Sequence, residues 1–200
     1  MRRNVPWLWI VFGSLLALAL GLGFYARRPH RASELGSEGG VTIEEDQPSA
    51  YPRDLMRARE AVAHGRMAEA EEIYRQLVAK DAQSPSGYVG VGSCCLFKGD
   101  ADGARKWYDQ ALARNPKCLS ARIGRGSSYL AQANPAEAIK EYEAVLALKE
   151  TVAEAHYGLA KGLLELHRRP EALRHAERFK QLAPDSQYIR DLEILLWTAR

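Results

Sequence analysis

Hydrophobic and polar positions divide the chain into three stretches of different character. Residues 5–26 contain no charged side chain, and residues 27–50 contain few large apolar ones. From residue 51 onward, apolar residues recur at intervals of three and four, a spacing that places side chains on one side of an α-helix. This third stretch is rich in Ala, Leu, Glu, Lys and Arg, which favour helix. The pattern predicts an all-α domain.

The first stretch has the length and composition of a transmembrane helix. Its 22 residues would extend about 33 Å as a helix, enough for a hydrocarbon core of about 30 Å. Trp7, Trp9 and Tyr25 lie near its ends, where aromatic side chains favour the membrane interfaces. We therefore expect residues 5–26 to anchor the protein in the lipid bilayer as one transmembrane helix, preceded by a short tail of residues 1–4.

A cleaved secretory signal is the alternative interpretation, because Ala17, Ala19 and Gly21 are small enough for a signal peptidase. An uncleaved anchor is favoured because the apolar run is longer than a usual signal core and arginines follow it directly. Positive charge is nearly balanced on the two sides, so it does not decide the orientation. By analogy with bacterial proteins anchored in this way, we expect the helical domain in the periplasm, with the cytoplasmic face as the alternative.

The second stretch, residues 27–50, is rich in Ser, Gly and Glu and shows no clear period. Such a segment cannot bury enough apolar surface to offset the entropy of ordering it. We interpret it as a flexible linker between the anchor and the helical domain. Its acidic trio, Glu44, Glu45 and Asp46, is expected to be solvated.

From Tyr51 the sequence repeats itself every 34 residues without a gap. Position eight of each copy is small, position twenty is alanine, and position twenty-four is tyrosine in three copies of four. In the copies 51–84, 85–118, 119–152 and 153–186, these residues are Ala58, Gly92, Gly126 and Ala160; Ala70, Ala104, Ala138 and Ala172; and Tyr74, Tyr108, Tyr142 and Ala176. Three positions that keep their size class over four copies predict an array of repeated structural units.

These positions resemble the tetratricopeptide repeat, whose unit is a helix–turn–helix of this length. The second copy matches the family best; the first and third lack the closing proline and have Ala82 and Glu150 there. The resemblance implies a right-handed α-solenoid of four repeats. Because the last repeat of a solenoid exposes an apolar side, residues 187–200, with Ile189 and Leu192, are expected to form a capping helix.

The sequence also predicts the turns between the two helices of a repeat. Gly65 and Gly99 are expected to leave their helices in a left-handed conformation. Asn134 followed by Pro135 predicts a helix start in which Asn134 caps and Pro135 takes the first helical position.

In the tetratricopeptide family, the first helix of each repeat lines a concave groove, with positions two, five, nine and twelve facing inward. The resemblance therefore implies a protein-binding groove, whose fifth and ninth positions are Leu55, Arg59, Val89, Ser93, Ile123, Ser127, Tyr157 and Lys161. The fifth positions are apolar, so we expect a peptide or an amphipathic helix of a protein partner to bind there. The alternative is that part of this row only packs helix against helix. One subclass clamps a C-terminal carboxylate with Lys and Asn at these positions, and those residues are missing here.

Glycine recurs at the sixth position of three copies, as Gly90, Gly124 and Gly158. A glycine inside a helix costs about 1 kcal/mol relative to alanine. Three copies in phase indicate a reason for this cost, either close packing or access of a ligand to the backbone.

No catalytic motif, phosphate loop or dinucleotide fingerprint occurs in the sequence, so we expect no enzyme activity and no cofactor. Cys94, Cys95 and Cys118 lack the spacing of a metal site or a disulfide framework and are interpreted as small buried residues. The histidines are interpreted as surface or packing residues. The net charge of +3 is mild, and basic residues alternate with acidic ones, so no nucleic-acid partner is expected.

Two classes of function remain. The first is a membrane-anchored interaction scaffold that assembles an envelope or secretion complex. The second is a chaperone-like holder of exported or unfolded segments. Self-association through the exposed ends of the solenoid is left open.

Overall fold

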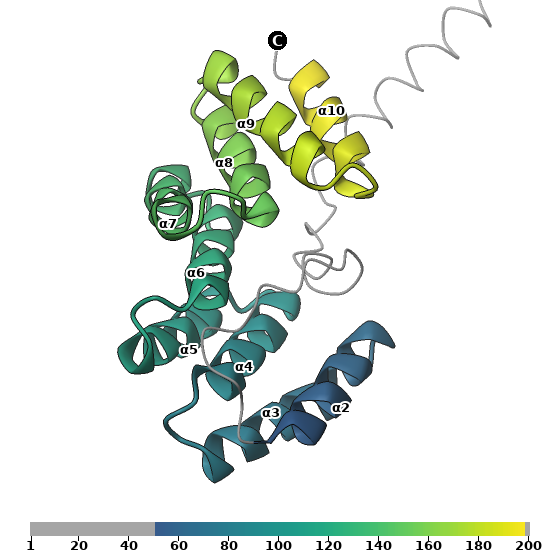
Figure 1. Cartoon of the computed structure of the whole chain (residues 1–200), viewed down its shortest axis with the longest axis vertical. Coiled ribbons are helices and arrows are strands. Elements are labelled where there is room, and N and C mark those ends of the chain that lie inside the picture. Colours follow the sequence, from purple (N-terminus) through teal and green to yellow (C-terminus); the bar gives the residue numbers. More distant parts are fainter. Residues whose placement is uncertain (1–50, 199–200) are drawn as a thin grey trace, which may run out of the picture. The chain divides into compact units, whose positions relative to one another are not determined.

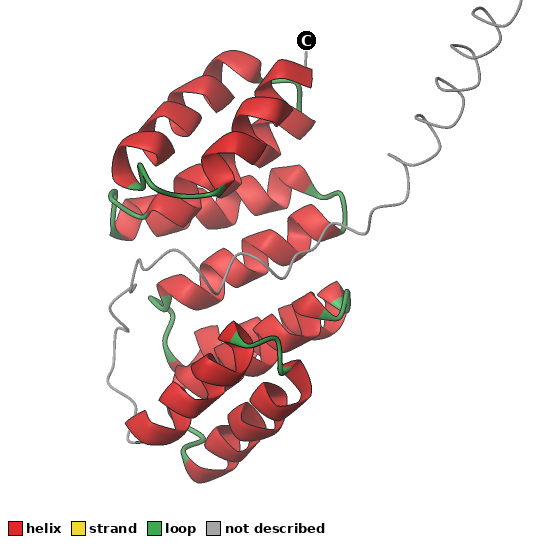
Figure 2. Ribbon diagram, turned by 90° about the vertical axis from the view of Figure 1, so that its right-hand side faces the viewer, coloured by secondary structure: helices red, strands yellow, loops and turns green. Residues whose placement is uncertain are grey.

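The computed structural model describes residues 51–198, and all of its regular structure is helical. The predicted anchor and linker lie outside the described residues. Within residues 51–198, no helix is both long enough and apolar enough to cross a bilayer. In this described part of the chain, nine helices follow one another (Figures 1 and 2): α2 Pro52–Ala63, α3 Met67–Lys80, α4 Pro85–Phe97, α5 Ala101–Arg114, α6 Leu119–Ala131, α7 Pro135–Leu148, α8 Ala153–Glu165, α9 Arg169–Leu182 and α10 Tyr188–Thr198.

The helices form four hairpins that stack in sequence order. In each repeat the first helix, here called the A helix, packs on the second, the B helix, and each B helix packs on the A helix of the next repeat. The A helices are α2, α4, α6 and α8, and the B helices are α3, α5, α7 and α9. Every B helix begins at position seventeen of its repeat, so the 34-residue period of the sequence is confirmed as the period of the structure.

The turn between the A and B helices has the same conformation in all four repeats. Gly65 and Gly99 have φ of 71° and 83°, which confirms the expected left-handed turn. Ala133 and His167 occupy the same position with φ of 55° and 59°. An L-residue pays about 1 kcal/mol for this conformation, so the geometry of the hairpin overrides the local preference in repeats three and four.

The starts of the B helices differ from expectation in one case. Asn134 occupies the N-cap position and Pro135 begins α7, as predicted, but the Asn134 side chain makes no capping hydrogen bond. Asp100 does cap α5, because its carboxylate accepts a hydrogen bond of 2.8 Å from the Gly103 N–H. Pro135 preorganises the first turn of α7, since its fixed φ suits that position.

Tyrosines of the B helices hold consecutive repeats together. Tyr108 and Tyr142 are fully buried, and each ring lies over a glycine of the next A helix, sixteen residues further along the chain. A Cβ atom added at Gly124 or Gly158 would overlap the ring. Tyr74 lies over Gly90 in the same way. Close packing is therefore the reason for the glycines at the sixth position.

The fourth junction uses a different pair at the same spacing. Ala176 stands where the other B helices have tyrosine, and Leu192, sixteen residues later, is the buried residue of α10. Both belong to one buried cluster, and α10 packs on α8 and α9. At this spacing, a small residue of the B helix is therefore followed by a large one of the next helix, the reverse of the other three junctions. α10 covers the end of the array, as expected for a capping helix, and occupies the place of a further A helix.

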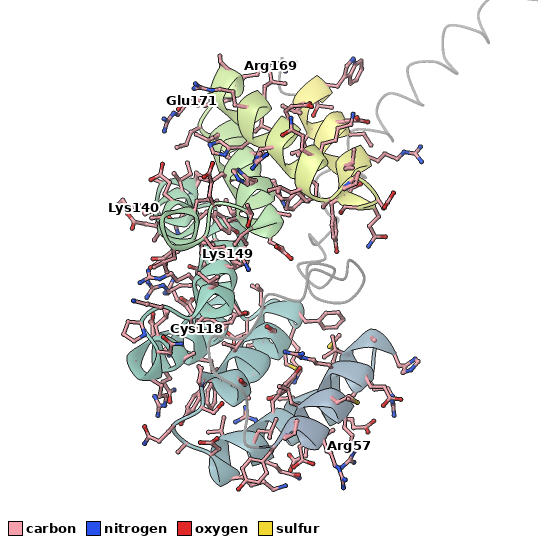
Figure 3. All side chains as sticks on the ribbon, viewed as in Figure 1. Arg57, Cys118, Lys140, Lys149, Arg169 and Glu171 are labelled. Carbon is pink, nitrogen blue, oxygen red and sulfur yellow. The ribbon has the colours of Figure 1, made fainter. Side chains whose placement is uncertain are left out.

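Buried apolar residues of the repeat domain fall into two clusters. The N-terminal cluster extends from α2 to the start of α6, and the C-terminal cluster extends from the start of α6 to α10. The boundary falls at α6 because the middle of that helix contributes small buried residues, Gly126 and Ser128, together with two arginines. Cys118, labelled in Figure 3, is buried beside the start of α6, and Arg57 and Lys140 are exposed.

Candidate protein-binding site

The A helices form one side of the stack. α4 contacts α6, α6 contacts α8, and α8 contacts α10, whereas the B helices of residues 51–198 make no comparable contacts with one another. Helices that approach more closely on one side of a stack put that side on the inside of its curve. We call the surface formed by positions two, five and nine of the A helices the A-helix face.

The eight predicted groove residues are unequally accessible. Leu55 and Tyr157 are only 7% and 6% exposed, so they lie beneath the face and offer little surface for contact with a partner. Val89 and Ile123 are half-buried, while Arg59 and Ser93 are exposed. The remaining two, Ser127 and Lys161, are of intermediate exposure.

The two serines at position nine have an internal role that the sequence did not reveal. Ser93 and the Tyr108 hydroxyl share a hydrogen bond of 3.2 Å, and Ser127 and the Tyr142 hydroxyl share one of 3.1 Å. Burial raises the pKa of both tyrosines, and the hydrogen bonds from the serines oppose that rise. Each serine therefore provides a partner for a buried hydroxyl that would otherwise lose its solvation.

Charge on the A-helix face lies at its two ends. Position nine is Arg59 in the first repeat and Lys161 in the last, with serine between them. The Lys161 ammonium lies 5.4 Å from the centre of the Tyr157 ring. Burial lowers the pKa of Lys161, and attraction to Glu165 and Asp191 opposes the fall. The middle of the face is neutral and the ends are charged.

Two histidines that sequence reasoning treated as separate meet between α8 and α9. The Nδ1 atoms of His156 and His175 are 3.0 Å apart, and His156 Nε2 lies 3.1 Å from the Glu150 carbonyl oxygen. Because a carbonyl only accepts, Nε2 of His156 carries the proton, and its Nδ1 accepts from Nδ1–H of His175. Burial lowers the pKa of both histidines. The pair packs α8 on α9.

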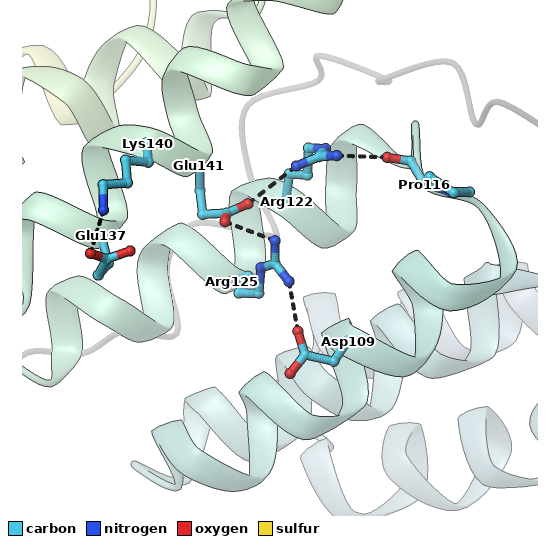
Figure 4. A network of polar contacts seen from close by, with 7 residues as sticks. All are labelled: Asp109, Pro116, Arg122, Arg125, Glu137, Lys140 and Glu141. Carbon is cyan, nitrogen blue, oxygen red and sulfur yellow. Dashed lines mark hydrogen bonds and ion pairs between the residues drawn. The ribbon is translucent and has the colours of Figure 1, made fainter.

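Ion pairs join α5, α6 and α7 (Figure 4). Arg125 lies 2.7 Å from Asp109 of α5 and 2.7 Å from Glu141 of α7, and Arg122 lies 3.5 Å from Glu141. Arg122 also donates to the Pro116 carbonyl. The Nε atoms of both arginines are buried without a hydrogen-bond partner. This cluster links neighbouring helices, and its charges are satisfied mainly within the protein.

Residues 51–198 contain no group of three side chains able to hold a metal ion. All three cysteines are buried, which confirms their interpretation as small buried residues. Burial raises the pKa of the Cys94 thiol to about 11, so it is protonated at neutral pH and unreactive.

The fold and the 34-residue period define a helix–turn–helix solenoid of the kind used for protein–protein contact. A tetratricopeptide repeat family model matches residues 55–117 and 123–187. The chain belongs to the tetratricopeptide repeat family. The comparison with curated proteins gave no match.

Solved structures with the same fold share about a fifth of their residues with this chain. The thermophilic tetratricopeptide repeat protein TTC0263 of Thermus thermophilus is 23% identical with a TM-score of 0.63, and the match covers 73% of this chain and 79% of that one. MamA is 20% identical with a TM-score of 0.56, covering 68% and 80%.

The second tetratricopeptide domain of human RPAP3 was solved in complex with the HSP70 peptide SGPTIEEVD. It is 22% identical with a TM-score of 0.50, and the match covers 55% of this chain and 91% of that one. Identities this low show the fold alone.

Proposed function

We propose that this protein is a membrane-anchored, non-enzymatic scaffold that binds a segment of a protein partner on its A-helix face, for assembly of an envelope or secretion complex. The observation that supports it most is the pairing of half-buried apolar residues, Val89 and Ile123, on adjacent A helices. The charged residues at the two ends of the face would give a partner segment polar anchoring points beside an apolar centre. The uncharged stretch of residues 5–26 supports the anchor.

A chaperone-like holder is the second candidate. The middle of the face is neutral, so it could bind client segments of many different sequences. The two functions differ in selectivity. A scaffold copurifies with a fixed partner at constant stoichiometry, whereas a holder suppresses the aggregation of many unrelated clients.

The peptide bound by the RPAP3 domain includes the sequence Thr-Ile-Glu-Glu. The same four residues occur at positions 42–45 of this chain, directly before the helical domain. The likeness stops at Asp46, where the chain continues and offers no terminal carboxylate. A variant lacking residues 41–46 is a control in the binding experiments: tighter partner binding by that variant would identify the segment as an intramolecular competitor.

The face is tested by the double substitution Val89→Glu and Ile123→Glu. Two buried charges opposite an apolar partner segment should abolish partner capture, measured by affinity purification of the full chain from its native membrane. Leu148→Glu is the matched control, because Leu148 is an exposed apolar residue of a B helix. Circular dichroism should show the same helical signal in all three proteins.

Unchanged capture by the double variant would refute the A-helix face as the binding site. Equal loss with Leu148→Glu would assign binding to the other side of the stack. A photocrosslinking amino acid at Ser93, followed by mass spectrometry, then identifies the partner, and the partner's compartment reports the orientation in the membrane. Removal of residues 5–26 should move the protein from the membrane fraction to the soluble fraction.

A further inference from the structure

The last repeat departs from the others at two positions of the A-helix face. Positions two and nine are both serine in repeats two and three, but they are Glu154 and Lys161 in repeat four. In the middle repeats the serine at position nine is bonded to a tyrosine hydroxyl. Repeat four has Ala176 in place of that tyrosine, so Lys161 has no such internal role.

Glu154 and Lys161 both lack a full set of partners within residues 51–198. The Oε2 atom of Glu154 is buried without a hydrogen-bond partner, and its carboxyl group interacts with its own backbone N–H. Burial raises the pKa of Glu154. Among the described residues, no carboxylate forms a salt bridge with Lys161, and Glu165 and Asp191 attract it from further away. A desolvated charge without a partner costs free energy that a ligand of opposite charge can recover.

The two groups share one side of α8 with an aromatic ring between them. Glu154, Tyr157 and Lys161 are spaced by three and four residues, which puts them in a row along the helix. Seven residues of helix span about 10 Å, so the charges are too far apart to neutralise each other. Tyr157 is fixed by Phe179 and Tyr188, whose rings lie 5.3 and 5.4 Å from its own.

We propose that Glu154, Tyr157 and Lys161 form a charge-selective subsite that binds a partner segment with one basic and one acidic side chain about 10 Å apart. The basic group pairs with Glu154, the acidic group pairs with Lys161, and the backbone between them passes over Tyr157. This spacing equals about three residues of an extended chain or about seven residues of a helix. The inference rests on the proposed function, because it names the partner chemistry at one end of the same face.

Selection from a display library of random peptides tests the subsite even while the partner is unidentified. The target is the full chain in detergent, as the native protein, as Lys161→Glu and as Glu154→Lys. The native protein should enrich peptides with opposite charges three or seven residues apart. Lys161→Glu should enrich peptides with two basic residues at that spacing, and Glu154→Lys should enrich peptides with two acidic ones. A selected peptide should lose about tenfold in affinity on Lys161→Met, as expected for one charged hydrogen bond.

The Val89→Glu and Ile123→Glu double variant separates this inference from the proposed function. If the double variant abolishes binding while Lys161→Glu enriches the same peptides as the native protein, the face binds partners but the subsite is wrong. If the double variant and Lys161→Glu both enrich the same peptides as the native protein, the A-helix face is not the binding site. Selection of peptides without the charge pair, or of none at all, overturns the subsite. Lys149→Glu, an exposed charge at the end of α7, is the matched control and should leave the selected sequences unchanged.

Discussion

Helices α4 and α6 occupy equivalent places in consecutive repeats and have opposite chemistry. α4 contains no charged residue and buries Tyr88, Val91, Cys94 and Leu96 between its neighbours. α6 presents Arg122 and Arg125 to α5 and α7, and beyond Leu119 at its start it buries only small residues, among them Ala121 and Ser128. Both helices nevertheless pack through a glycine under a tyrosine of the preceding repeat.

The difference shows which parts of the repeat are structurally required. The small residues and the tyrosine set the distance between helices, and the remaining interface positions accept either apolar or ion-paired residues. The choice has an energetic consequence: dissolved salt screens an ion-pair cluster and weakens it, but it does not screen contacts between apolar side chains. The N-terminal and C-terminal clusters are therefore joined at α6 by contacts of a different kind from those inside each cluster.

Enlarging a glycine under a tyrosine should produce the largest effect, at either helix. We expect Gly90→Leu and Gly124→Leu each to cost about 3 kcal/mol, since the new side chain would occupy the space of the ring. Tyr108→Ala combined with Gly124→Leu should recover part of that loss, because it copies the natural pair of Ala176 and Leu192. Urea unfolding followed by circular dichroism measures the free energies. A double variant no more stable than Gly124→Leu alone would contradict the size exchange.

Removal of the shared carboxylate should destabilise the protein at α6 by a smaller amount. Glu141→Ala leaves two arginines that are about one-quarter exposed, so we expect about 2 kcal/mol, below the cost for a fully buried pair. The loss should shrink when the salt concentration is raised. Glu137→Ala, which removes an exposed ion pair with Lys140 seen in Figure 4, is the control and should cost less than about 0.5 kcal/mol.

The smallest expected effect is a pH response confined to the C-terminal cluster. The folded-state pKa of His156 and of His175 lies below the unfolded value of about 6.5, so protonation opposes folding. Their contribution is present above that pH and is lost as the pH falls below it. Around the pair, Arg174 and Arg178 lower these pKa values, and Glu150 and Glu171 raise them.

Hydrogen exchange at about pH 7.5 and about pH 5.5, on either side of the unfolded pKa and corrected for intrinsic rates, localises this response. Protection of α8 and α9 should fall at the lower pH, while that of α4 and α5 should not change. His156→Leu with His175→Leu removes the titrating groups and should abolish the difference. Loss of protection spread evenly over all helices would show that other groups control the response.

The arrangement of the repeats was predictable because their period and small residues are visible in the sequence. The contact of Tyr108 with Gly124 was also within reach, since the same spacing of sixteen residues joins three pairs. The sequence shows the repeated glycines and the repeated tyrosines separately. Only when each glycine is paired with a tyrosine does close packing, and not access of a ligand to the backbone, explain the glycines. Left-handed turns were predicted at Gly65 and Gly99 and missed at Ala133, where a hairpin common to all repeats imposes the conformation.

Contacts that depend on helix rotation were not predictable. Arg125 and Glu141 looked like alternating surface charges, and only the packing of α6 on α7 brings them together. His156 and His175 are nineteen residues apart, a separation that has no meaning until α8 and α9 are placed. For the A-helix face, the family resemblance supplied the positions, but it could not show that Ser93 is bonded to Tyr108.

The pairing of each B helix with the following A helix limits how such a chain gains and loses units during evolution. Deletion of repeat two or repeat three leaves a tyrosine facing a glycine at the new junction, so the inner units are interchangeable. Deletion of repeat four would bring Tyr142 over Leu192, where both partners are large. Helices α9 and α10 must therefore be inherited together as one terminal piece, and engineered lengthening or shortening of the array should be confined to the units before it.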